Sequence, residues 1–296
     1  MEMPLVSVII PAYNRGHLIG ETINSVINQT YDNWELIIVD DGSTDETKST
    51  IEKFSDTRIQ YHKINHSGLL GLVRNQGISH ASGEYIAFLD SDDMWHPEKL
   101  QIQVKLFKTS PLTTFIITHI EFFGPAAHPV GNYPSLIAED LLERYLEEHH
   151  FTFYPSTLVF KKTALAAASR LNEHQAFGAD TEFFIQLCLN FKGSFIGERL
   201  VRIRKHSENT SSNNVIPGYF ESIETLHKLF EKKHITKKTF QLTASKLYYK
   251  AGLILLRNEP REAAKLFRAY IAIKPLHWKG WVRLLQSLFQ SLNSNL

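Results

Sequence analysis

The sequence of 296 residues predicts an α/β fold, a sheet flanked by helices, followed by an all-helical C-terminal extension. Two observations support this. In the first hundred residues, short runs that are apolar on both faces alternate with segments of helical apolar spacing, which is typical of a parallel sheet covered by helices. From Tyr219 onward, almost all signals are helical. We therefore expect one large domain over 1–218 and a basic helical extension over 219–296.

The strand predictions rest on continuous apolar runs. The first, 6–10, should end at Pro11, since proline lacks the N–H that a sheet ladder needs. Further strands are predicted by the same kind of run at 35–39, 59–61, 85–89, 115–117 and 157–160.

The helix predictions rest on apolar periodicity and end signals. Asp45 is a plausible N-cap for a helix that reaches Phe54, and Pro97 should open the helix after the fourth strand. Further helices are predicted at 18–27, 73–81 and 183–190.

Acidic residues follow two of these strands. Asp40 and Asp41 come after one strand, and Asp90, Asp92 and Asp93 after another. Ligands collect at the carboxyl ends of parallel strands, so we expect these acids to converge on one edge of the sheet. Two carboxylates one residue apart can face a common ligand and hold Mg²⁺ or Mn²⁺. Each run is equally compatible with a solvated turn, or with Asp93 capping the next helix.

The sequence lacks the motifs of several classes of binding site. It has no glycine-rich dinucleotide fingerprint, no P-loop and no Cys/His cluster for structural zinc. The single cysteine, Cys188, excludes an internal disulfide and fits a reducing compartment. We expect no secretory signal and no membrane-spanning segment, and therefore a cytoplasmic protein.

Charge is unevenly distributed. Residues 228–296 hold 14 Lys and Arg against 3 Asp and Glu, although the whole chain has a net charge of +1. This predicts either a solvated basic face or attraction to an anionic membrane, a lipid phosphate or an acidic partner. Apolar residues recur at helical spacing within 273–296, which predicts either a packed helix or a helix lying at the inner membrane face.

Four motifs occur in a defined order: VSVIIPAYNR (6–15), IIVDDGSTD (37–45), VRNQGISHASGEYIAFLDSDD (73–93) and ADTEFF (179–184). In order and spacing they resemble the family 2 inverting glycosyltransferases with a GT-A fold. The resemblance implies a metal-dependent transfer of a sugar from a nucleotide-diphosphate sugar, with UDP the expected nucleotide, to an acceptor hydroxyl. It places the reaction in bacterial polysaccharide or glycolipid synthesis.

The resemblance also implies a donor site. The loop after the first strand would pack around the nucleotide base, and the second acid after the second strand would hydrogen-bond it. The first acid of the D-x-D motif would contact the ribose. The donor-binding residues implied in this way are Pro11, Ala12, Tyr13, Asp41, Arg74, Asp90 and Ser91.

The resemblance also implies metal-binding and catalytic residues, most of which lie later in the sequence. Asp92 would bind the Mn²⁺ or Mg²⁺ that bridges the donor diphosphate, and His206 would contact the metal. Asp180 would be the catalytic base, although the family's Glu-Asp pair is here Ala179-Asp180. An N-cap role for Asp180 and the use of Glu182 as base are the competing interpretations.

The expected partners are the nucleotide-sugar donor and a glycan or lipid-linked acceptor, with no nucleic acid. Because the Glu of the pair is missing, a non-catalytic nucleotide-sugar-binding or interaction protein on the same fold is the alternative. A phosphoryl-transfer or receiver-type domain is a third hypothesis, and it would need a lysine at the end of a later strand. Trp95 could stack on a sugar face or pack in the core.

Overall fold

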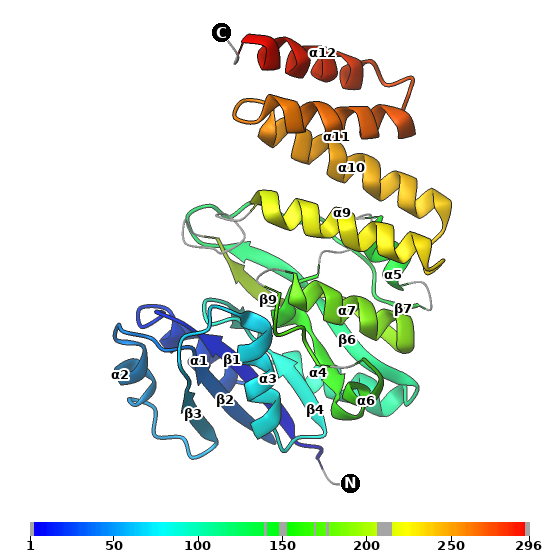
Figure 1. Cartoon of the computed structure of the whole chain (residues 1–296). Helices are drawn as coiled ribbons and strands as arrows, with labels where there is room; N and C mark the ends of the chain where they lie inside the picture. Colours follow the sequence, from blue (N-terminus) through cyan, green and yellow to red (C-terminus); the bar gives the residue numbers. More distant parts are fainter. Residues whose placement is uncertain are drawn as a thin grey trace. The chain divides into compact units, whose positions relative to one another are not determined.

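The computed structural model divides into two compact units, Met1–Ser207 and Glu208–Leu296. The first unit is an α/β unit and the second is all-helical (Figure 1). The residues that the structure describes are 3–138, 141–147, 153–168, 170–175, 178–205 and 215–293.

The first unit is built on a mixed sheet with the strand order β3-β2-β1-β4-β8-β6-β9-β5, and β7 pairs with β9. Strands β3, β2, β1 and β4 are parallel, whereas β8 is antiparallel to both β4 and β6. This confirms the parallel sheet predicted for the first hundred residues. The strands are β1 (Val6–Ala12), β2 (Trp34–Asp40), β3 (Ile59–Lys63), β4 (Tyr85–Phe88), β5 (Met94–Trp95), β6 (Thr113–Phe123), β7 (Leu136–Ala138), β8 (Val159–Lys161) and β9 (Lys192–Arg204).

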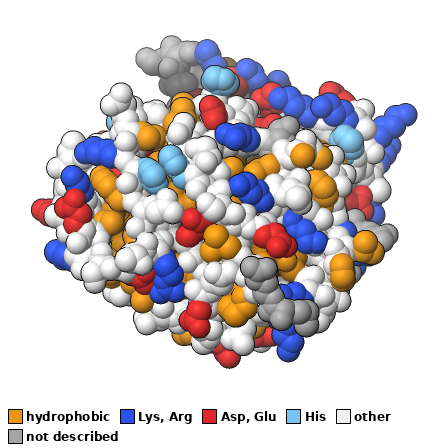
Figure 2. Space-filling model, turned by 90° about the horizontal axis from the view of Figure 1, so that it is seen from below, with side chains coloured by type: hydrophobic (Ala, Val, Ile, Leu, Met, Phe, Trp, Pro, Cys, Tyr) orange, Lys and Arg blue, Asp and Glu red, His pale blue; other side chains and the backbone are white. Residues whose placement is uncertain are grey.

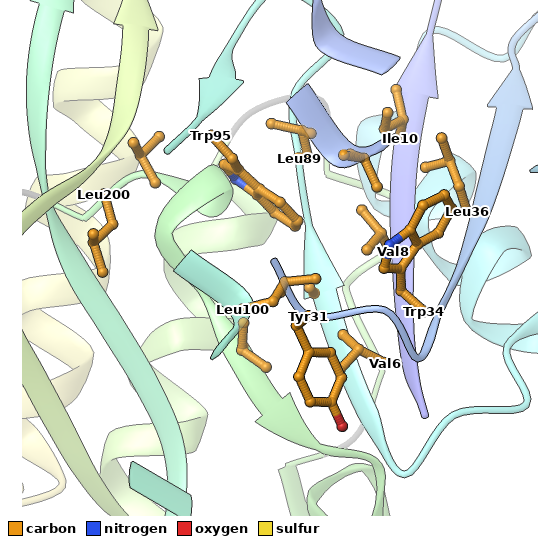
Figure 3. Close-up of a cluster of buried hydrophobic side chains, with 14 of the residues drawn as sticks. Val6, Val8, Ile10, Tyr31, Trp34, Leu36, Leu89, Trp95, Leu100 and Leu200 are labelled. Carbon is orange, nitrogen blue, oxygen red and sulfur yellow. The ribbon is translucent and has the colours of Figure 1, made fainter. Parts of the chain in front are cut away.

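Helices cover both faces of this sheet, because alternate residues of each strand point to opposite sides. Val8 and Ile10 of β1 pack with α1 and α4 in one core, part of which Figure 3 shows, whereas Ile9 packs with α3 and α7 in the other. The helices are α1 (Ile19–Ile27), α2 (Thr47–Ile51), α3 (Leu70–His80), α4 (Lys99–Thr109), α5 (Leu141–Leu146), α6 (Leu165–Ala168) and α7 (Ala179–Asn190), with 3-10 turns η1 (Pro155–Thr157) and η2 (Lys162–Ala164).

Pro11 does not end β1, contrary to the prediction, because β1 continues to Ala12. The carbonyl of Ile9 accepts from the N–H of Leu89, so Pro11, two residues on, faces the same side of the strand. The ladder with β4 has already ended there, at the pair Ile9 and Phe88. The missing N–H of proline therefore costs no ladder bond.

Helix ends also differ from the sequence predictions. Asp45 does accept a bond from the N–H of Thr47, but α2 stops at Ile51. Beyond it, the N–H of Phe54 reaches only to the carbonyl of Ile51, a tighter 3-10 spacing. The helix expected at Pro97 begins at Lys99.

The second unit contains α9 (Val215–Glu231), α10 (Lys237–Leu255), α11 (Pro260–Ile273) and α12 (Trp278–Asn293). Its core contains small residues and aromatic rings: Ala251, Ala263 and Phe267 are fully buried, and Tyr270 is 7% exposed. A Cβ added to Gly252 would lie 2.9 Å from the Phe267 ring, so glycine lets α10 approach α11 closely. Among the helices that the structure describes, none is long and apolar enough to cross a membrane.

Candidate functional site

The carboxyl ends of β1, β2 and β4 meet at one edge of the sheet, because these parallel strands are neighbours in the order β2-β1-β4. Pro11 and Ala12 are the last residues of β1, and Tyr13 follows them. Asp41 comes directly after β2, where its N–H donates to the carbonyl of Ala12 over 2.8 Å. Asp90 begins the acidic turn that follows β4.

A buried guanidinium connects two of the predicted site residues. Arg74 of α3 is 1% exposed; its Nη2 donates to Asp90 Oδ1 over 2.5 Å, and its Nη1 donates to Asp180 Oδ1. Burial acts to lower the pKa of Arg74, but the charges of Asp180 and Asp90 raise it above its ordinary value. Arg74 therefore stays charged and ties the D-x-D motif to the predicted catalytic base.

Asp90 and Asp93 have different surroundings. Burial raises the pKa of Asp90 to about 6, against the opposing charge of Arg74. Asp93 is 3% exposed, and burial raises its pKa well above the usual range, with Asp90 and Asp92 adding to the rise. Asp93 does not cap α4: its carboxylate accepts from Ser156 Oγ over 2.6 Å and from the N–H of Arg204 over 3.1 Å.

Ser156 forms hydrogen bonds to both ends of the acidic turn 90–93. Its hydroxyl donates to Asp93, as above, and accepts from the N–H of Asp90 over 3.0 Å. Its carbonyl accepts from Trp95 Nε1 over 2.8 Å. Trp95 is 4% exposed and belongs to the core, so of its two predicted roles the packing role is the one observed.

Asp92 is partly exposed, and its carbonyl accepts from Arg204 Nε over 3.0 Å. In the same turn, Ser91 is buried, and its carbonyl accepts from Thr22 Oγ1. His206, the second predicted metal contact, lies outside the described residues. Within the described part of the chain, no group of three or more His, Cys, Asp or Glu side chains could hold a metal ion.

The sequence pair Arg74-Asn75 has a structural explanation. Asn75 donates to the carbonyl of Leu171 and to Glu173 Oε1, both over 2.8 Å, and accepts from the N–H of Leu171 over 3.1 Å. Arg74 faces the acids while Asn75 fixes the segment that leads to α7. A Cβ on Gly71 would lie 2.3 Å from the Asn172 carbonyl, so only glycine allows this approach.

Asp180 lies in the first turn of α7, whose N-cap is Gly178 with φ +71°. The structure therefore does not use Asp180 as the N-cap, and its carboxylate instead meets Arg74. Ala179 is buried, and a Cβ on Gly71 would lie 3.3 Å from its methyl group. Glu182 accepts from Asn172 Nδ2 over 3.3 Å and does not share in the Arg74 contact.

Asp41 has partners within the chain. Its Oδ1 accepts from the N–H and the hydroxyl of Ser67, and its Oδ2 accepts from the N–H of Gly68, over 2.8–2.9 Å. His66 Nδ1 lies 3.0 Å from Oδ2, and its ring stacks on Tyr13 with centroids 4.1 Å apart. The loop 66–68 thus occupies the carboxylate that was predicted to bind the base, and that role stays a prediction.

Sequence reasoning missed Ser156 and His66 as members of the site. Ser156 directly precedes the strand predicted at 157–160 and belongs to no motif, and His66 resembles a solvated histidine in the sequence. Only the fold brings them to the edge, through contacts 63 and 25 positions apart.

The comparisons with known proteins agree with this geometry. A family model described as "Glycosyl transferase family 2" matches residues 7–167, more than half of the chain. The chain belongs to glycosyltransferase family 2. It is thus a glycosyltransferase, and its mixed α/β sheet with flanking helices is the GT-A fold of this family.

Curated relatives of the chain include glycosyltransferases named for a diphosphoundecaprenol substrate and for teichuronic acid biosynthesis. The chain is 44% identical over 106 residues to the UDP-Glc:alpha-D-GlcNAc-diphosphoundecaprenol beta-1,3-glucosyltransferase WfgD of Escherichia coli, covering 36% of this chain and 42% of that protein. It is 42% identical over 104 residues to the putative teichuronic acid biosynthesis glycosyltransferase TuaG of Bacillus subtilis, covering 34% and 41%. The chain thus spans less than half the length of these relatives.

Solved structures share the fold. TarS 1–349 of S. aureus, crystallised with UDP-GlcNAc, has a TM-score of 0.74 at 19% identity and covers 95% of this chain and 88% of its own. The mannosyltransferase PcManGT of Pyrobaculum calidifontis, in complex with GDP-Man and Mn²⁺, has a TM-score of 0.58 at 18% identity, covering 99% and 88%.

Proposed function

We propose that this glycosyltransferase transfers a sugar from a UDP-sugar to an acceptor hydroxyl with inversion at the anomeric carbon. The observation that carries the proposal is the position of Arg74, which contacts both Asp90 and Asp180. The donor site and the catalytic base must be close enough for both to contact the reacting sugar. Here the Arg74 guanidinium contacts both Asp90, a predicted donor-site residue, and Asp180, the predicted base. The UDP donor is favoured by the name of the E. coli relative.

The donor would lie along the edge formed by β1, β2 and β4. Tyr13, which is 41% exposed, offers a ring face on which a base can stack, and His66 now lies on that ring. Binding of a base to Asp41 then requires the loop 66–68 to release at least one of its bonds. Asp90 and Ser91 would contact the ribose and the diphosphate side of the donor.

The residues fit a divalent cation that is bound mainly by the substrate. Asp92, the last acid of the D-x-D motif, is partly exposed, and a Mg²⁺ or Mn²⁺ ion commonly uses one or two carboxylates plus substrate phosphates. When bound there, the ion would supply positive charge to the departing diphosphate. His206 is proposed as a further contact.

Asp180 would act as general base. Its carboxylate would take the proton of the acceptor hydroxyl while that oxygen attacks the anomeric carbon, and the bond from that carbon to the diphosphate oxygen would break on the opposite face. Arg74 donates to the Asp180 carboxylate and would hold it at this edge, oriented toward the donor.

We propose a glycan or lipid-linked acceptor in bacterial polysaccharide or glycolipid synthesis, reached from the cytoplasmic side. The relatives' names support this acceptor class, since the E. coli enzyme is named for a diphosphoundecaprenol substrate. No specific sugar or acceptor follows from the site residues.

The test is isothermal titration of UDP, with Mn²⁺ and with EDTA, followed by a transfer assay. We expect Mn²⁺-dependent binding that Asp92→Ala loses. Asp180→Asn should keep UDP binding but lose about 10²–10⁴-fold in kcat. Glu182→Gln, two positions along the same helix, is the matched control and should keep its turnover. Near-normal turnover of Asp180→Asn would remove it as the base, and UDP binding without transfer by the wild type on any acceptor would favour a non-catalytic binding protein.

A further inference from the structure

Helix α12 of the second unit has two apolar faces. One face packs inward: Leu284 is 9% exposed, Ser287 is fully buried, and a Cβ on Gly280 would lie 2.7 Å from the Tyr270 ring of α11. The other face is exposed and repeats every three or four residues, so it forms one stripe along the helix. This α12 stripe consists of Trp278 (65% exposed), Trp281 (46%), Val282 (47%), Leu285 (65%), Phe289 (67%) and Leu292 (68%).

Many of the exposed large hydrophobic side chains lie in the α12 stripe. Together with Leu276, which is 97% exposed in the turn before α12, it makes up half of the large hydrophobic side chains that are exposed in the described part of the chain. Single exposed hydrophobic residues are ordinary, but a contiguous exposed patch is typical of an interaction surface.

The charge beside the stripe has one sign. Lys279 and Arg283 lie on the third, polar face of α12, and Lys274 lies just before the helix. The segment 274–296 has no acidic residue. By contrast, acidic and basic side chains are interspersed across most of the face shown in Figure 2. An apolar stripe with two tryptophans and flanking cations has the composition of a helix that lies in a bilayer interface.

We propose that the α12 stripe binds the surface of an anionic lipid bilayer, with the helix lying in the plane of the interface. Its apolar side chains would enter the headgroup and acyl boundary while Lys279 and Arg283 contact lipid phosphates. Each such cation near an anionic surface strengthens the attraction to it, so binding should weaken as the salt concentration rises. In a symmetric contact between two copies of α12, neither copy would supply an acid to pair with these cations, since α12 carries none. This surface is separate from the proposed donor site and does not depend on its function.

The test is co-sedimentation of the full chain with phosphatidylcholine vesicles, with and without phosphatidylglycerol. Tryptophan fluorescence gives a second readout, because Trp34 and Trp95 are buried while Trp278 and Trp281 are exposed. We expect binding to the anionic vesicles with a blue shift, and much weaker binding to phosphatidylcholine alone.

Variants then assign the contact. Leu285→Ser with Phe289→Ser should weaken partitioning at least about tenfold, since each side chain loses its transfer free energy. The matched control, Phe220→Ser with Leu253→Ser, removes two exposed hydrophobic residues elsewhere in the unit and should bind normally; these side chains are 42% and 38% exposed.

The charge variants are tested in the same assay. Lys279→Glu with Arg283→Glu should reduce binding to anionic vesicles, whereas Lys237→Glu with Lys238→Glu on exposed α10 positions should reduce it less. Equal losses would overturn the assignment to α12. Absence of vesicle binding by the full chain at low salt would overturn the proposal, and so would a dimer that only the stripe variants dissociate. UDP titration of the same variants should be unchanged, which separates this test from that of the catalytic function.

Discussion

The first unit buries charged side chains, whereas the second unit exposes large apolar ones. Arg74, Lys99 and Asp93 are at most 3% exposed, while Trp278 and Leu285 are each 65% exposed. Charged side chains usually lie at the surface and large apolar side chains in the core. Both arrangements therefore cost free energy unless a partner offsets the loss. In the first unit the partners are within the chain. For the α12 stripe, the described residues of its unit provide no cover, and the partner that we propose is a lipid bilayer.

Lys99 illustrates internal compensation. Its Nζ donates to Gln103 Oε1 over 2.8 Å and lies 4.0 Å from the centroid of the Trp95 ring. Gln103 in turn donates to the carbonyls of Ile116 and Thr157. Burial lowers the pKa of Lys99 well below its usual range. Lys99 is therefore part of a network that reaches Ser156 of the acidic site through Trp95.

The largest expected effect comes from breaking the central ion pairs. Arg74→Met should lower the free energy of unfolding by about 3 kcal/mol, because it leaves two carboxylates without their cation. We take the low end of the usual range since the side chains of Asp90 and Asp180 keep 32% and 21% exposure. Urea denaturation measures the change.

The control for this variant is Arg202→Met, which breaks a pair with Glu121 whose side chains are 43% and 44% exposed. An exposed pair contributes about 0–1 kcal/mol, so this variant should stay close to wild type. Equal losses in the two variants would mean that Arg74 is an ordinary surface arginine in energetic terms.

In the second unit, the adjacent residues Leu284 and Leu285 of α12 should contribute differently to stability. Leu284→Ala should cost about 2 kcal/mol, the low end of the usual range for a core leucine, because it removes methyl groups from a packed face where the side chain keeps 9% exposure. Leu285→Ala should change stability by less than about 0.5 kcal/mol, since that side chain is 65% exposed. Thermal unfolding of the two variants without lipid checks this. A similar cost at both positions would mean that the stripe packs against protein in solution.

Much of the first unit could be predicted from local patterns. Apolar runs located β1, β2, β3, β4, β6 and β8, whereas β5, β7 and β9 were not predicted. Helical periodicity located α1, α3 and α7, and the parallel order of the first four strands followed from the alternation. Acids placed after strands then had to lie at one edge, because parallel strands end on the same side. These features depend on residues close together in the sequence.

The partners of those acids could not be predicted. The pairing of Arg74 with Asp180 joins positions 106 apart, and that of Asp41 with Ser67 joins positions 26 apart. Local spacing carries no information about such contacts, since they depend on how α3, α7 and the loop 66–68 pack. The same holds for Ala179: the sequence showed only a missing Glu, whereas the structure shows a buried methyl group beside Gly71.

The smallest expected effect tests whether the acidic turn must be held in place. Ser156→Ala leaves the N–H of Asp90 and one oxygen of Asp93 without their shared partner, which should cost about 1–3 kcal/mol of stability. If Ser156 positions the D-x-D motif, Mn²⁺-dependent UDP affinity should fall as well. The matched control is Thr157→Ala, because Thr157 is equally buried and its hydroxyl donates to the carbonyl of Tyr154, outside the acidic turn. That variant should lose stability but keep its UDP affinity. Loss of affinity in both variants would show that η1 acts on the donor site only through general packing, and the specific role of the Ser156 hydroxyl would then be wrong.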